Sequence, residues 1–131
     1  MEFIWQDRYS VENHAIDQEH KHIVRLMNEF YRESQTSAWD KCKLILDNLT
    51  QVVVDHFAHE EDMMTKADFA GLPTHKVIHT QLIKQASDIF GKFKEDPSAE
   101  ASKEISLFLS HWLASHICGI DMKYKDDLKK L

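Results

Sequence analysis

Residues 52–64 read VVVDHFAHEEDMM, a stretch in which histidines and carboxylates interrupt an apolar helical pattern. His56 and Glu60 are four residues apart, so on a helix they lie on one face, one above the other. That face also carries Cys42, Leu46, Leu49, Val53 and Met63. A stripe of this kind is the one that a helix of a bundle buries. A buried charge is costly unless it is paired or binds a metal, so the rest of the chain should supply a partner.

The composition of the 131 residues favours one all-α domain and excludes several functions. It is 43% hydrophobic and 29% charged, with only 3 Gly and 2 Pro, which suits long helices around an ordinary core. The net charge of −6 and the lack of a basic block argue against nucleic-acid binding. No apolar run reaches the ~18 residues of a membrane span, and the N-terminus does not resemble a signal peptide. Two cysteines without a motif predict a reduced, cytoplasmic setting, and a monomer is the default expectation.

Three breaks in the helical pattern predict an antiparallel up-down four-helix bundle. They are the polar or Gly- and Pro-containing segments 34–37, 70–74 and 95–98. We expect helices near 17–34, 38–66 and 75–94 and a fourth from 99, with Asp17 and Thr74 as N-caps of the first and third. The whole chain, 1–131, is then one domain. It comprises an N-terminal arm (1–15), the bundle (16–118) and a short C-terminal helical segment (119–131).

All four predicted helices bring metal-binding residue types to the same end of the bundle. When neighbouring helices run antiparallel, the starts of the first and third helices lie at the same end of the bundle as the ends of the second and fourth. The residues at this level are His20, His56, Glu60, His75, His79 and His116, followed by Asp121. Asp121 lies five residues after His116, about 140° around an ideal α-helix. It reaches the others only sideways, or if the helix is irregular near Gly119.

Each of these residues alone has a simpler interpretation. His20 on an apolar stripe is more often a core or surface histidine, and His56 with Glu60 could be an exposed helical pair. His75 and His79 have the spacing with which two imidazoles hold one metal from a helix. Together, however, the seven donors would be buried and mutually unsatisfied without a metal.

The size and chemistry of this donor set favour two metal ions and one small ligand. Zinc uses only four ligands, whereas seven suit two larger octahedral ions. With both carboxylates and one further oxygen bridging, one coordination position stays open on one metal. Ferritin-type sites contain more carboxylates. Because imidazoles stabilise high-valent iron less than carboxylates do, the set favours binding O2 over consuming it.

These motifs resemble those of the hemerythrin family, in particular its single-domain bacterial members. The matching segments are IDQEH (16–20), HFAHEE (56–61), HKVIH (75–79) and WLASHICGID (112–121), and the resemblance spans essentially the whole chain. It implies two iron ions joined by an oxo or hydroxo bridge. One iron would be held by His75, His79 and His116 and the other by His20 and His56, with Glu60 and Asp121 bridging.

The resemblance also implies where O2 would bind. The ligand would sit at the iron of His20 and His56, in an apolar pocket formed by Ile23, Phe57, Trp112 and Leu113, and Tyr124 matches the family pattern as well. At position 114 the family usually carries a bulky aliphatic residue. Ala114 is therefore expected to widen an access path and to speed O2 exchange or autoxidation.

The expected function is that of a non-enzymatic O2 carrier or store that supplies an oxidase or oxygenase. The alternatives are an O2 or redox sensor, an enzyme that handles peroxide or nitric oxide, and an iron donor. The other histidines are expected to lack a role: His14, His22 and His59 exposed, and His111 partly buried. Glu61 is expected on the outer face beside His59.

Overall fold

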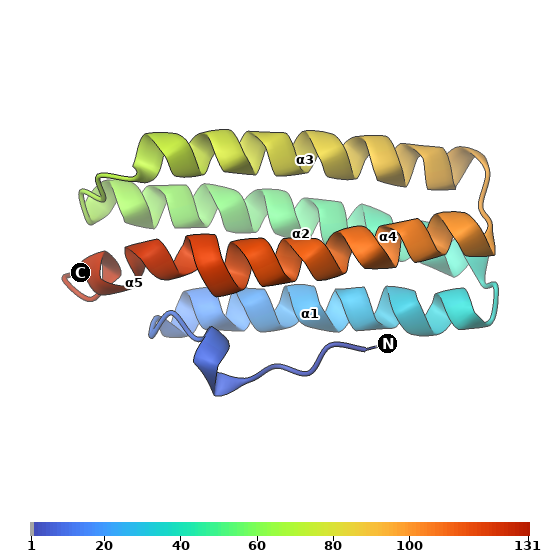
Figure 1. Ribbon diagram of the computed structural model, residues 1–131, viewed down its shortest axis with the longest axis horizontal. Coiled ribbons are helices and arrows are strands. Elements are labelled where there is room, and N and C mark those ends of the chain that lie inside the picture. The colour runs from blue at the N-terminus through green and yellow to red at the C-terminus, as the bar shows by residue number, and fades with distance from the viewer. Residues whose placement is uncertain (1) are drawn as a thin grey trace.

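The chain folds into four long antiparallel helices with a short helical segment at the C-terminus (Figure 1). The computed structural model describes residues 2–131, so Met1, the first residue of the predicted arm, lies outside the described residues. The long helices are α1 (His14–Gln35), α2 (Trp39–Lys66), α3 (Leu72–Glu95) and α4 (Ala99–Trp112). Helix α1 packs on α2 and α4, and α3 packs on the same two, so the helices follow one another around the bundle.

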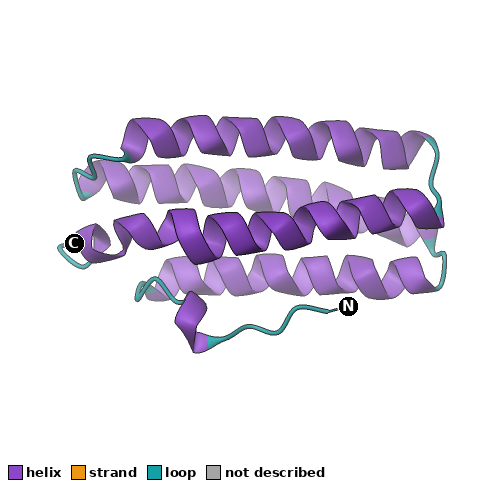
Figure 2. Cartoon of the chain, viewed as in Figure 1, coloured by secondary structure: helices purple, strands orange, loops and turns teal. Residues whose placement is uncertain are grey.

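Beyond α4 the chain remains helical, but the type of helix changes. A π-helical segment, η2 (Leu113–Ile120), continues the axis of α4. It is followed by the 3₁₀ turn η3 (Asp121–Tyr124) and by α5 (Lys125–Leu128), while the arm contains a 3₁₀ turn, η1 (Asp7–Tyr9). Figure 2 shows that the connections between the long helices lie at the two ends of the bundle. Within residues 2–131, no helix is long and apolar enough to cross a membrane.

The predicted N-caps of the first and third helices are wrong. Helix α1 begins at His14, and Asn13 caps it by accepting from the backbone N–H of Ile16 at 3.1 Å. Asp17 instead fixes the arm, because its carboxylate accepts from the Ser10 hydroxyl at 2.5 Å and from the Val11 N–H at 2.9 Å. Helix α3 begins at Leu72 with a proline in its first turn and no side-chain cap, since proline suits a position whose N–H needs no partner.

Two apolar clusters enclose a polar layer near one end of the bundle. The larger one fills the middle of the bundle and includes Phe30, Leu46 and Phe93. The smaller one lies beyond the polar layer and includes Ile16, Met64 and Tyr124. Ile16 stands one turn before His20, and Met64 one turn after Glu60. The polar layer is therefore closed off from water on both sides.

Candidate metal centre

The seven residues predicted to bind metal converge in this buried layer, which we call the polar cluster. Each has a side chain at most 2% exposed: His20, His56, Glu60, His75, His79, His116 and Asp121. Their donor atoms form two groups, in each of which all atoms lie within 4.8 Å of one another. One group contains three imidazoles, the other contains two, and both include Glu60 and Asp121.

The two oxygens of Asp121 face different groups. Its Oδ1 lies 3.0 Å from His75 Nε2 and 2.9 Å from His116 Nε2. Its Oδ2 lies 3.1 Å from His20 Nε2. A carboxylate placed in this way can contribute one oxygen to each of two metals.

Glu60 lies between the same two groups. Its Oε1 is 3.3 Å from His56 Nε2 and 3.2 Å from His79 Nε2, and its Oε2 is 3.5 Å from His20 Nε2. The hydroxyl of Tyr124 donates a hydrogen bond to Oε2. Tyr124 is buried near Asp121 and Glu60, and burial together with these two carboxylates raises the pKa of its hydroxyl. It therefore remains a hydrogen-bond donor to the carboxylate.

The π-helical segment brings Asp121 into the cluster. The backbone N–H of Asp121 bonds to the carbonyl oxygen of His116, an i to i+5 bond in place of the usual i to i+4 bond. An i to i+5 bond encloses one residue more than an i to i+4 bond, so residues five apart come onto nearly the same face. The irregularity starts at Leu113, well before Gly119, where it had been expected.

The buried donor atoms of the polar cluster are better satisfied by bound metal ions than by the groups of the protein alone. Several of its donor atoms are buried without a hydrogen-bond partner, including His20 Nε2, His56 Nε2, His75 Nε2 and both oxygens of Asp121. Such groups are rare in folded proteins because an unpaired buried polar atom is costly. Burial opposes a charged His56, but Glu60 and Glu19 outweigh it and raise the pKa of His56 to about 10. The layer thus attracts positive charge, from protons or from metal ions.

Glu19 and Glu61 hold the outer nitrogens of two cluster histidines, and the sequence did not reveal this role. The carboxylate of Glu19 lies 2.6 Å from His56 Nδ1 and 2.5 Å from His59 Nδ1. Glu61 lies 2.8 Å from His79 Nδ1. In both cases Nε2 faces the cluster, so Nδ1 carries the hydrogen and donates it. Partners of this kind orient imidazoles that bind metals and raise their basicity.

The expectation that Glu61 and His59 have no role on the outer face is therefore wrong. Both belong to these hydrogen-bond networks because α1 and α3 pack against α2 at this level. His14 is exposed as expected, and His22 is half-buried. His111 is exposed rather than partly buried, since it points outward beside the inward-facing Trp112.

The residues predicted to form the O2 pocket lie next to the cluster but face two different spaces. The Phe57 ring stacks on His79, with centroids 3.8 Å apart, and Trp112 lies nearly parallel to His116. Ile23, Phe57 and Trp112 line an internal apolar cavity. Leu113 instead borders, with Ala114, a hollow beneath the N-terminal arm.

Comparison with known protein families decides the relationship. The family described as "Hemerythrin HHE cation binding domain" matches residues 11–128. The chain belongs to the hemerythrin family. This agrees with the two donor groups of the polar cluster, which both share the carboxylates of Glu60 and Asp121.

Individual hemerythrins align with nearly the whole chain. A myohemerythrin of Riftia pachyptila is 32% identical over 96% of this chain and 93% of its own length. A bacteriohemerythrin of Stenotrophomonas maltophilia is 29% identical over 96% of this chain and 81% of its own. A crystal structure of a hemerythrin variant superposes with a TM-score of 0.84 at 25% identity, covering 96% of both chains. The prediction of an all-α four-helix hemerythrin fold is thus confirmed.

Proposed function

We propose that this hemerythrin binds O2 reversibly at a pair of iron ions and acts as an oxygen carrier or store. The observation that carries the proposal is the asymmetry of the polar cluster. Two carboxylates are common to both donor groups, but one group has three imidazoles and the other has two. A pair of octahedral metals held in this way has one position left for an external ligand, on the metal with fewer imidazoles.

The proposed ligands follow the two donor groups. His75, His79 and His116 hold one iron, His20 and His56 hold the other, and Glu60 and Asp121 bridge. When bound, two ferrous ions supply the two electrons that reversible O2 binding requires. Imidazole and carboxylate donors both suit iron, although other divalent metals accept the same set.

The surrounding side chains keep this centre dry. Phe57, Trp112 and Leu113 are at most 4% exposed and pack next to the polar cluster. Exclusion of water prevents side reactions at a reactive centre. In this protein it would slow the irreversible oxidation that ends O2 binding, and this distinguishes a carrier from an enzyme that turns over.

Repeated oxygenation of the reduced protein tests the proposal. Protein loaded with ferrous iron under anaerobic conditions is exposed to O2, and the O2 is then removed. A coloured oxygenated form that reverts over many cycles, with two irons per chain by elemental analysis, is the expected result. Rapid conversion to ferric protein with turnover would indicate an enzyme instead, and one zinc per chain would contradict the account.

An oxygen carrier implies a recipient that consumes O2, namely an oxidase or oxygenase. The single-domain boundaries, the monomeric state and the cytoplasmic setting stay predictions. Both cysteines are free.

A further inference from the structure

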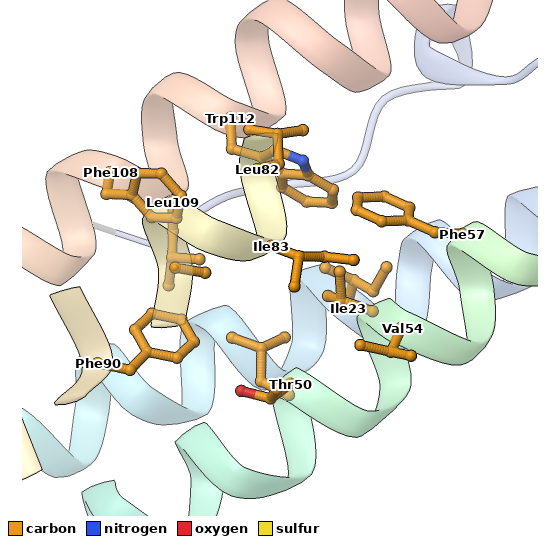
Figure 3. A pocket seen from close by; sticks show the side chains of 13 residues that line it. Ile23, Thr50, Val54, Phe57, Leu82, Ile83, Phe90, Phe108, Leu109 and Trp112 are labelled. Atoms are coloured by element: carbon orange, nitrogen blue, oxygen red, sulfur yellow. The ribbon is translucent and has the colours of Figure 1, made fainter. Parts of the chain in front are cut away.

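An apolar cavity of about 40 Å³ lies between the long helices, next to the polar cluster (Figure 3). Aliphatic and aromatic side chains from all four long helices line it, and Thr50 at its rim is the one hydroxyl among them. The volume exceeds the ~10–15 Å³ that one water-sized molecule needs. Apolar cavities of this kind stay dry and take up apolar gases.

The inner end of the cavity lies one helical turn from the metal ligands proposed above. Four lining residues, each on a different helix, stand three or four positions from a cluster histidine and on its face: Ile23, Val53, Leu82 and Trp112. Residues at this spacing are direct neighbours along a helix. Along its helix, each of the four lies closer to the middle of the bundle than the cluster histidine does. The cavity is therefore the layer next to the polar cluster along the bundle axis.

The outer part of the cavity extends much farther than one bound diatomic molecule requires. Leu49 lines it seven residues before His56, which is about 10 Å along the helix axis. Phe90, eleven residues after His79 and so about 16 Å along the axis of α3, also lines it and packs in the main core. The cavity therefore holds space remote from the metals as well as space beside them.

The cavity approaches solvent between α2 and α3. On α2, Thr50 and Val54 are four apart and both exposed, Val54 by 39%. Ile83 on α3 is half-buried and lines the same cavity. Figure 3 shows Thr50 and Val54 on the α2 side of the cavity, with Phe57 and Trp112 farther along it.

We propose that this cavity is the access route of O2 to the metal centre and holds a second, remote docking position for it. The inference rests on the proposed function, because it takes O2 as the ligand. Its apolar lining admits an uncharged diatomic molecule and disfavours water and ions, which need polar partners. The chain thus delivers O2 through the bundle interior without opening the centre to solvent.

The hollow at Ala114 is the competing route, and its structure suits O2 less well. It is larger, about 290 Å³, but its walls include the charged Arg8 and the hydroxyl of Ser110. Leu113, only 3% exposed, closes it on the inner side. Ile23, Phe57 and Trp112 do not line it. It resembles a surface depression more than a passage to the polar cluster.

Xenon provides a direct probe of the cavity that needs no iron chemistry. Crystals of the iron-loaded protein are pressurised with xenon, and the expected result is a xenon atom within the cavity. In the variant Ala86→Leu, which adds volume to a lining residue, the xenon site should be lost. Absence of xenon from the unaltered protein would overturn the inference.

O2 kinetics then test whether the cavity is the route. A block at the mouth, Val54→Trp, should slow O2 association by about fivefold or more, and dissociation equally. The affinity should stay unchanged, because a barrier on the path affects both directions alike. Ala86→Leu should act in the same direction. The matched control Leu44→Trp, at an α2 residue that is 70% exposed and outside the cavity, should leave both rates unchanged.

The outcomes separate this inference from the proposed function. If Ala114→Trp slows association and Val54→Trp does not, O2 enters beneath the arm and the inference is overturned while O2 binding stands. If xenon fills the cavity but no reversible O2 adduct forms, the proposed function fails and the route fails with it. Melting curves and iron content of each variant identify a misfolded one, in which case Ile83→Trp at the same mouth replaces Val54→Trp.

Discussion

Glu19 and Glu61 act on different halves of the metal centre, and this allows a matched test. Glu19 holds His56, a proposed ligand of one metal, and Glu61 holds His79, a proposed ligand of the other. Loss of such a partner typically costs 10–100-fold in metal affinity. We expect Glu19→Gln to weaken binding of the metal held by His56, and Glu61→Gln to weaken binding of the metal held by His79. Each variant should retain the other metal. Titration with Co(II), followed by absorption, measures this, and equal loss of both metals in either variant would contradict the assignment.

Leu113 closes the protein side of the hollow beneath the arm, so its truncation should admit water. The expected result for Leu113→Ala is faster autoxidation of the oxygenated protein, because water reaches the centre more easily. Absorption decay under air measures the rate. The control Leu107→Ala removes an exposed leucine from α4, the helix that η2 continues, and should not change the rate. An unchanged rate in Leu113→Ala would show that this side chain does not wall the centre.

Sequence reasoning found the polar cluster but not the residues that support it. Six of the cluster residues stand on apolar stripes of their helices, so the pattern marks them as buried, and the seventh, Asp121, follows His116 too closely to be overlooked. Glu61 follows Glu60 directly and so points about 100° away. Whether it contacts an imidazole depends on the relative orientation of α2 and α3 about their axes. The apolar stripes in the sequence do not specify that orientation. The need of each metal-bound imidazole for a second partner could have directed attention to the glutamates beside His20 and Glu60.

At the scale of elements, η2 makes a five-residue spacing equivalent to a four-residue one. Deletion of Gly119 should therefore allow an α-helix to place His116 and the aspartate on one face, about 40° apart, and two metals per chain should still bind. An alanine inserted after Gly119 separates them by about 240° and should abolish binding of at least one metal. A methyl group at Gly119 would meet no atom within 4 Å, so Gly119→Ala, which keeps the spacing, should leave both metals bound and serves as the control. Metal loss on deletion together with retention on insertion would contradict this role of η2.

The spacing between His116 and Asp121 indicated an irregular helix but not where it begins. Glycine suggested position 119, because glycine is the usual site of helix irregularity. The irregularity instead spans Leu113–Ile120. It begins where Trp112 and Leu113 must both pack inward, a constraint set by the neighbouring helices. The number and order of the long helices, by contrast, depend on local turn residues and were predicted correctly.

For the whole molecule, metal binding, protonation and stability should be coupled. The pKa of His56 is raised from 6.5 to about 10 in the metal-free chain. Its protonation therefore stabilises that state fully below pH 6.5, and the contribution is lost as pH rises through about 10. Because metal binding requires neutral imidazole, binding at pH 8 should release a proton from His56, and affinity should rise with pH. Calorimetry in buffers of different ionisation enthalpy measures the protons released. Equal heats in all buffers would contradict this.

Removal of the metals should destabilise the whole bundle. Without them the partnerless donor atoms of the polar cluster remain buried, and the stabilisation that comes from ligand binding is lost. We expect treatment with a strong chelator to lower the melting temperature by about 10 °C or more. Circular dichroism measures the shift, and re-addition of metal should reverse it. An unchanged melting temperature after verified metal removal would show that the cluster is stable alone.

The cavity beside the polar cluster also has a mechanical consequence. A folded chain that encloses empty space occupies more volume than its unfolded form, in which water fills that space. Hydrostatic pressure should therefore unfold this bundle more readily than one whose core is filled, and Ala86→Leu should shift the pressure midpoint upward. The passage proposed for O2 would then also make the fold sensitive to pressure.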